Sequence, residues 1–157
     1  MLLADINDTG YNIILFLHIL TMFAAFAPMF VHPFIDRETA GGDASVRQAV
    51  FAGIAARSMR IYGSMLILGG LLGFGVAGMS KAPGTDELVY SVSDSWLWPA
   101  VLLWVAMNGV LHGMIIPGEK GIAAGDDVVG RKAEIGGMLI TLMFLVTLYL
   151  MVFKPGA

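Results

Sequence analysis

Long stretches of apolar residues alternate with shorter polar segments along the chain. Four such stretches run over residues 11–32, 61–79, 96–117 and 135–153, and each is 19 to 22 residues long. At ~1.5 Å per residue, helices of this size are roughly 28 to 33 Å long, which matches a hydrocarbon layer of about 30 Å. Every Lys, Arg, Asp and Glu lies outside the four stretches, where an unpaired charge is less costly. The pattern therefore predicts an all-α polytopic membrane protein with four transmembrane helices in a single domain.

Composition supports this prediction. The chain is 57% apolar and 13% charged, and its mean hydropathy is +0.79, whereas soluble domains are about half apolar and a quarter charged. The net charge of −3 is small and unclustered, so nothing indicates nucleic-acid binding. The chain has no cysteine, which excludes disulfides and thiolate chemistry.

The first apolar stretch is interpreted as a retained helix rather than a cleaved signal peptide. The segment before it carries Asp5 and Asp8 but no Lys or Arg, whereas a secretory signal begins with a positive region and has a shorter apolar core.

The distribution of basic residues predicts the orientation. Seven of the nine Lys and Arg residues fall between the first and second stretches or between the third and fourth. By the positive-inside rule these two segments are cytoplasmic, so both termini and the segment 80–95 lie outside. Short connections between helices of alternating direction then predict an antiparallel four-helix bundle.

The first cytoplasmic segment has the pattern of a short amphipathic helix over residues 44–57. Asp43 is a suitable cap, and apolar residues recur every four positions from Val46 to Ile54. We expect this helix to lie along the lipid surface, with Arg57 and Arg60 as interface anchors. The alternative is that it is the solvated beginning of the second transmembrane helix.

Two tryptophans, Trp96 and Trp98, open the third apolar stretch. Because indole favours the headgroup level, both are predicted to anchor the outer membrane interface. The segments 80–95 and 118–134 are predicted to be plain connectors, since neither resembles a phosphate-binding loop.

Small residues at four-residue spacing predict helix-packing surfaces. The second stretch has Gly69, Gly73 and Ala77, and the third has Gly109 and Gly113. Such surfaces let another helix backbone approach closely. Asn108 lies near the second surface and is expected to hydrogen-bond between helices, the alternative being that it orients the imidazole of His112.

Three histidines inside the stretches are the candidates for cofactor binding. By the helical rise, His18 lies roughly 10 Å below the outer boundary, His112 about 24 Å and His32 about 31 Å. A haem b with two axial imidazoles needs ligands at similar depth, which leaves His32 with His112, or His18 with its mate in a symmetric dimer. The alternative is that all three are structural.

Copper is a second cofactor hypothesis. Thioether and imidazole donors suit Cu(I), and methionines lie close in sequence to each histidine. The candidate metal ligands are Met22, Met29 and Met114.

Several short elements of the chain resemble a known family. They are Leu17-His18-Ile19-Leu20 in the first stretch, the glycine-rich second stretch, the third stretch from Trp96 to Pro117 and the closing Met151-Val152-Phe153-Lys154-Pro155-Gly156. Together they resemble an uncharacterised bacterial "predicted integral membrane protein" family, a domain of unknown function, and more remotely copper-resistance and haem-associated membrane proteins. The resemblance implies four helices in the bacterial inner membrane and points to His18 as a functional position.

We expect a non-catalytic subunit or scaffold that packs against other membrane subunits, or against its own copies, in a larger membrane complex such as a respiratory one. One alternative is a haem- or copper-binding protein. The other is a small transporter, which is the weakest because no charged residue lies within any predicted span. No residue is predicted to be catalytic.

Overall fold

The structure is a computed structural model that describes residue 6 and residues 8–156. Four long helices account for most of the described chain. The first is α1 (Thr9–Ala40) and the last is α6 (Asp127–Phe153). The second consists of α2 (Ala44–Ser58), the π-helical turn η1 (Met59–Gly63) and α3 (Ser64–Gly78), and the third of α4 (Leu97–Val110), the π-helical turn η2 (Leu111–Ile115) and α5 (Ile116–Ala124).

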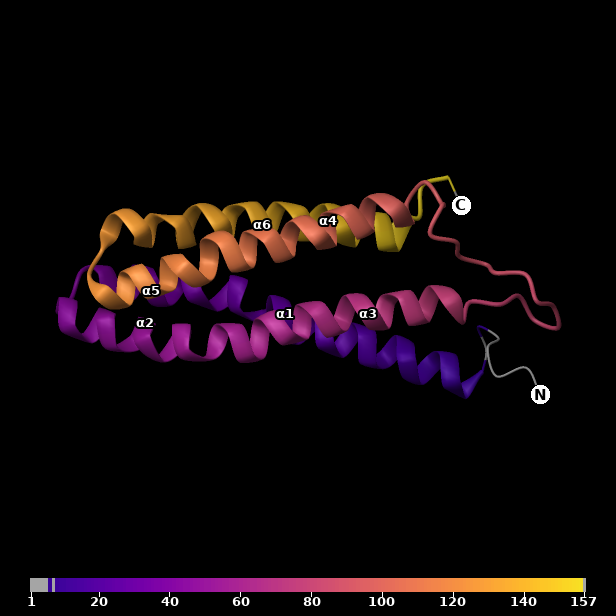
Figure 1. Cartoon of the computed structure of the whole chain (residues 1–157), viewed down its shortest axis with the longest axis horizontal. Helices are drawn as coiled ribbons and strands as arrows, with labels where there is room; N and C mark the ends of the chain where they lie inside the picture. Colours follow the sequence, from indigo (N-terminus) through magenta and orange to yellow (C-terminus); the bar gives the residue numbers. More distant parts are fainter. Residues whose placement is uncertain (1–5, 7, 157) are drawn as a thin grey trace.

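All four helices are long and apolar enough to cross a membrane. This confirms the prediction of an all-helical chain with four candidate spans. In Figure 1, α1 begins and α6 ends at the same end of the molecule as the connection between α3 and α4. We call this the loop end, and the opposite end, with the short turns at residues 41–43 and 125–126, the turn end.

The amphipathic segment 44–57 does not form a separate surface helix. Helix α2 continues through η1 into α3 without a break, giving one helix of 35 residues. Asp43 caps it, since its side chain accepts a hydrogen bond from the Ser45 N–H. The expectation of a helix lying along the lipid surface is therefore wrong, and the segment is the beginning of the second long helix.

The predicted connector 118–134 is also helical for most of its length. Helix α5 extends to Ala124, and α6 begins at Asp127. Gly125 adopts a left-handed conformation with φ of 76°, and the side chain of Asp126 accepts a hydrogen bond from the Val129 N–H. A glycine C-cap followed at once by an acidic N-cap makes a two-residue turn. The π-helical turn η2 directly precedes α5, so it loosens the regular hydrogen-bond ladder just ahead of Pro117, where the backbone N–H is missing.

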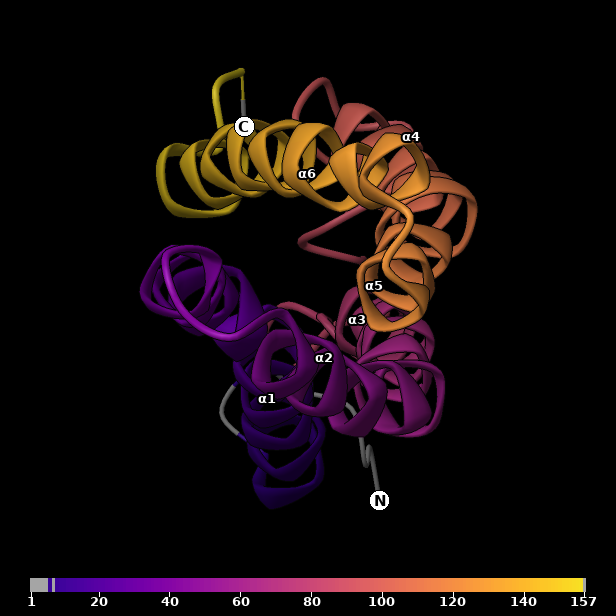
Figure 2. The same ribbon diagram turned by 90° about the vertical axis from the view of Figure 1, so that its left-hand side faces the viewer.

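Glycines allow α5 and α6 to pack backbone against backbone. A Cβ atom added at Gly118 would lie 2.3 Å from the Ala133 nitrogen, and one added at Gly121 would lie 2.8 Å from the Gly130 nitrogen. Viewed from the turn end, α2 and α5 lie side by side, with α6 against α5 (Figure 2). The glycines of the segment predicted to be a plain connector are thus part of a helix contact.

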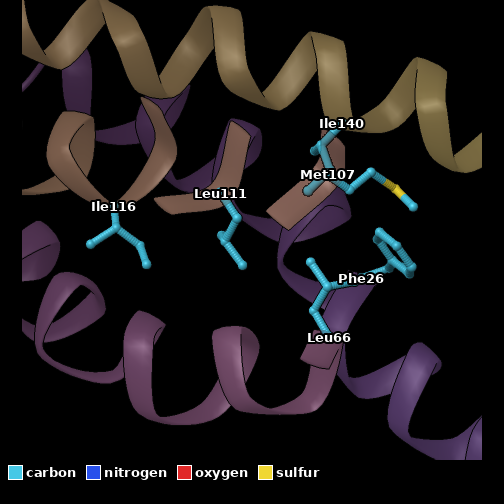
Figure 3. Packing of buried hydrophobic residues seen from close by; sticks show 6 residues of the cluster. All are labelled: Phe26, Leu66, Met107, Leu111, Ile116 and Ile140. Atoms are coloured by element: carbon cyan, nitrogen blue, oxygen red, sulfur yellow. The ribbon is translucent and has the colours of Figure 1, made fainter. Parts of the chain in front are cut away.

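The main apolar core lies where all four long helices meet. Its buried side chains are Phe26, Leu66, Met107, Leu111, Ile116 and Ile140 (Figure 3). Helix α1 also reaches α6 through Phe26 and Phe144, whose ring centroids are 4.5 Å apart. A smaller cluster of Ala77, Trp96 and Leu97 closes the loop end.

Candidate functional site

A buried carboxylate lies between three of the long helices, on the turn side of the core. Glu119 of α5 is only 2% exposed. Its Oε1 lies 3.1 Å from Nδ1 of His32 on α1, and its Oε2 accepts a hydrogen bond of 2.5 Å from the hydroxyl of Ser58, the last residue of α2. Ser58 itself is fully buried. We call these three residues the acid–histidine cluster.

Both π-helical turns border this cluster. The Tyr62 ring of η1 meets the His32 ring edge to face, with centroids 5.7 Å apart. The next residue, Gly63, faces His112 of η2, whose Cε1 would lie 3.1 Å from a Cβ added there. Two of the three histidines therefore lie against neighbouring residues of η1. Single π turns in α-helices occur often at functional sites.

The cluster has the groups needed to bind one proton. A buried carboxylate is costly unless it is paired and hydrogen-bonded, and here an imidazole and a hydroxyl provide both. A proton added to neutral His32 makes an imidazolium beside the carboxylate, whereas a proton added to Glu119 makes a neutral acid. Either change alters the charge of a site shielded from water.

Sequence reasoning singled out His32 but missed Glu119 and Ser58. Glu119 lies two residues beyond the predicted end of the third span, in the segment interpreted as a connector. The available signal was the spacing of Ile116, Glu119 and Ile122, which are all buried and recur every three residues. This pattern continues the helical face past Pro117.

His18 lies in a different environment, between α1 and α3. Its Nδ1 is 2.7 Å from the backbone oxygen of Gly69, and its Cε1 would lie 3.0 Å from a Cβ added at Gly73. A Cβ at Gly69 would lie 2.9 Å from Sδ of Met22. The small-residue surface with Gly69 and Gly73 thus receives α1 of the same chain, and Ala77 of that surface is buried at the loop end.

The second predicted packing surface is not covered by the described chain. Cβ atoms added at Gly109 and Gly113 would meet no atom within 4 Å. The Nδ2 of Asn108 donates to the Trp104 carbonyl on its own helix at 2.9 Å, while its buried Oδ1 has no partner. Asn108 therefore makes neither of the predicted hydrogen bonds, between helices or to His112.

The structure does not gather the candidate metal ligands at one place. Met29 packs on the main core, and Met114 lies against Gly136 of α6. The side chain of His18 lies against α3, whereas that of His32 lies beside Glu119. Within residues 8–156, no group of three or more His, Asp or Glu side chains is placed to hold a metal ion.

The predicted interface anchors divide into two kinds. Trp98 is 50% exposed, and Arg57 and Arg60 are exposed as well. Trp96 is only 3% exposed, because it packs against the Tyr90 ring at 5.5 Å. Trp96 is therefore part of the core at the loop end and not an anchor in lipid, which corrects the prediction.

No protein-family model, no curated protein and no solved structure matches the chain.

Proposed function

We propose that the chain is an integral membrane subunit that binds and releases a proton at the acid–histidine cluster. The burial of Glu119 beside His32, at the junction of three membrane-length helices, carries this proposal. Ionisable side chains at membrane depth are costly, and those that are retained belong mostly to proton or ion pathways. We therefore favour a proton-binding subunit over a purely structural one, because Glu119 is the charged group that the predicted spans lacked.

The contacts suit both charge states of the pair. When His32 is neutral, the Ser58 hydroxyl donates to the Glu119 carboxylate. When His32 binds a proton, its Nδ1–H donates to Oε1 of Glu119 along the 3.1 Å contact. The proton adds one charge, and charge-assisted hydrogen bonds compensate for it within the cluster.

We further propose an antiparallel bundle that spans the bacterial cytoplasmic membrane, with both termini outside. The clustering of basic residues at the turn end supports this orientation, since positive residues favour the cytoplasmic side. The bacterial membrane is what the resemblance of the sequence elements to the bacterial family implies. In this orientation the acid–histidine cluster lies in the cytoplasmic half of the bundle.

The outer surface of α4 supports a role as a subunit. Exposed residues recur there at helical spacing and form one stripe: Trp98, Leu102, Val105, Ala106, Gly109 and Gly113. We call this the α4 stripe. Its two glycines leave open space, so a helix of another subunit or of a second copy can approach the backbone closely.

Infrared difference spectroscopy of the protein in lipid nanodiscs tests the proton site. Between acidic and alkaline pH the wild-type chain should show, in addition to the bands of its exposed carboxylates, changes in the bands of one buried carboxyl group and its imidazole partner. Glu119→Gln should remove these changes, whereas Glu87→Gln, which alters an exposed glutamate at the loop end, should leave them. Spectra of Glu119→Gln identical to those of the wild type would overturn the proposal.

Extraction in mild detergent tests the subunit role. We expect a second membrane protein, or a second copy, to migrate with the chain and to be lost when Gly109→Leu and Gly113→Leu are combined. Gly78→Leu is the matched control, because Gly78 is also exposed with open space but lies off the α4 stripe. An absorption spectrum and metal analysis of the same sample test for haem b or copper. A lone monomer in every sample would contradict the subunit role.

A further inference from the structure

A polar pocket opens at the turn end, beside the acid–histidine cluster. Its volume is about 240 Å³, and it is lined by Asp36 of α1, Arg47 of α2, Ile122 of α5 and residues of α6 that include Asp127 and Glu134. A neighbouring pocket of about 250 Å³ shares Arg47, Ile122 and Asp127. Both are large enough to hold several water molecules.

Arg47 lines both pockets and ties three helices together. Its Nε and Nη2 donate to Oδ1 of Asp36 at 3.1 and 2.8 Å, and its Nη1 donates to Oδ1 of Asp127 at 3.3 Å. Asp127 is 86% exposed on its side chain, whereas Asp36 is 36% exposed. The contact to Asp127 is therefore the outer and weaker of the two, because exposed ion pairs contribute little.

The pocket comes within one helical turn of the buried pair on two helices. Asp36 follows His32 by four residues on α1, and Ile122 follows Glu119 by three residues on α5. Residues at these spacings share a helix face and lie about 5 to 6 Å apart. The pocket wall and the proton-binding pair are thus neighbouring layers of the same bundle.

The layer between them is apolar. Ile122 is 4% exposed and Phe51 of α2 is 2% exposed. Ile122 packs closely on α6, since its Cγ1 would lie 2.8 Å from a Cβ added at Gly130. The Arg47 guanidinium covers the Phe51 ring at 5.8 Å. Ile122, which lines the pocket and lies one helical turn from Glu119, therefore stands between the pocket and the carboxylate.

We propose that this pocket is the vestibule through which protons from water reach the acid–histidine cluster, with Ile122 and Phe51 as its barrier and the Arg47–Asp127 ion pair as its latch. This inference rests on the proposed function. When the Arg47–Asp127 ion pair breaks, α6 can move away from α2. The packing of Ile122 against Gly130 of α6 then becomes looser. The charged side chains that line the pocket are Asp36, Arg47, Asp127, Arg131 and Glu134. His32 and Tyr62 lie at the buried pair, and His112 faces Gly63 beside them.

Cysteine labelling tests the route, because the chain has no cysteine of its own. Ile122→Cys in sealed vesicles is exposed to a charged, membrane-impermeant methanethiosulfonate from either side. Val128→Cys, at a position that is 84% exposed, identifies the accessible side at the turn end, and Leu66→Cys, at a position 1% exposed, gives the rate for a core site. We expect Ile122→Cys to react only from the side of Val128→Cys, and faster than Leu66→Cys.

The latch is tested by adding Asp127→Asn to Ile122→Cys. Loss of an exposed ion pair should raise the labelling rate about two- to fivefold. Asp86→Asn is the matched control, because it breaks the exposed pair of Asp86 with Lys81 at the loop end. Equal rates for Ile122→Cys and Leu66→Cys, or no effect of Asp127→Asn beyond that of Asp86→Asn, would overturn the inference.

Amide hydrogen exchange of α5 provides a second test of the ion pair. It needs no introduced cysteine, so Ile122 stays in place. Asp127→Asn should speed exchange at Glu119 and Ile122, and Asp86→Asn should not. The infrared experiment reports on the proton site itself. If the infrared change is normal but Asp127→Asn alters neither the labelling rate nor amide exchange, only the vestibule is overturned. If the infrared change is absent, the proposed function is overturned.

Discussion

Two histidines on α1 lie in environments that differ in one decisive respect. His18 contacts the backbone oxygen of Gly69 at 2.7 Å, and its ring lies over Gly73. His32 contacts the carboxylate of Glu119 at 3.1 Å. A peptide carbonyl is not a titratable group, whereas a carboxylate is. The same side chain on the same helix is therefore a packing element in one region and half of the proposed proton-binding pair in the other.

The two regions also differ in how they hold their polar groups. Around His18, glycines let side chains approach the backbone of α3, and Trp104 likewise donates from Nε1 to the Leu66 oxygen at 2.8 Å. Around His32, side chains from three helices satisfy one another. The first arrangement depends on shape, and the second on charge, so substitutions should affect them differently.

The largest effect is expected from Glu119→Ala. Removing the carboxylate leaves His32 and the buried Ser58 hydroxyl without their partner, and breaking such a buried pair costs about 3–5 kcal/mol. Glu119→Gln keeps an oxygen acceptor and should cost less, about 1–3 kcal/mol. Unfolding by sodium dodecyl sulfate in mixed micelles, followed by circular dichroism, measures both. An effect of Glu119→Ala equal to that of an exposed substitution such as Glu134→Ala would show that the buried pair is not coupled.

A smaller effect is expected from Gly70→Ala in the region of His18. The new Cβ would lie 2.1 Å from Cε2 of Trp104, so the indole or α4 must shift, which costs about 1–3 kcal/mol. Gly109→Ala is the control, because open space surrounds it and alanine favours the helix by up to about 1 kcal/mol. The same unfolding titration measures both, and an equal response of the two variants would contradict the close fit of α3 and α4.

Hydropathy was sufficient to predict the number and order of the helices but not their ends. The apolar stretches mark where a chain can meet lipid, whereas a helix continues as long as its backbone is hydrogen-bonded and packed. Residues 118–124 illustrate this, because Glu119 and Lys120 favour helix and Gly118 and Gly121 fit against α6. The spacing of glycines predicts that another helix can approach closely. It does not specify which helix of the chain, or of another chain, does so.

The candidate site was only half predictable for the same reason. His32 stood out because it is polar within an apolar stretch. Glu119 did not, because a carboxylate just beyond a span is ordinarily solvated. Its burial depends on α1 and α2 extending alongside α5 at the turn end, and these contacts join residues 61 and 87 positions apart. The burial of Trp96 likewise depends on Tyr90 and Lys154, which reach it from outside its own helix.

Replacing each histidine by phenylalanine sharpens the comparison directly. His18→Phe keeps a ring over Gly73 and loses one hydrogen bond, so the free energy of unfolding should fall by about 0.5–1.5 kcal/mol. The infrared bands of proton binding should be unchanged. His32→Phe should remove those bands, because the carboxylate loses its imidazole partner. Loss of the bands in His18→Phe would mean that the two regions are not functionally distinct.

The smallest effect is expected at Asp43, the exposed cap of α2. A substitution there distinguishes the effect of acid on the surface of the turn end from its effect on the buried pair. The Ser45 N–H donates to Oδ1 of Asp43 at 2.8 Å, and this bond holds the pKa of Asp43 below its ordinary value of 3.8. Because the folded-state pKa is lowered, the cap contributes stability above the ordinary value and loses it as the pH falls through the folded-state value.

Asp43→Asn keeps an oxygen that can accept from Ser45 but removes the charge. We expect slightly faster amide exchange in the first turn of α2 at neutral pH, and no further acceleration in acid beyond the chemical exchange rate. The wild-type turn should show that further acceleration. If both chains show the same acceleration in acid, the acceleration comes from another group and not from Asp43. The effect of the cap could then not be separated from that of Glu119 and His32.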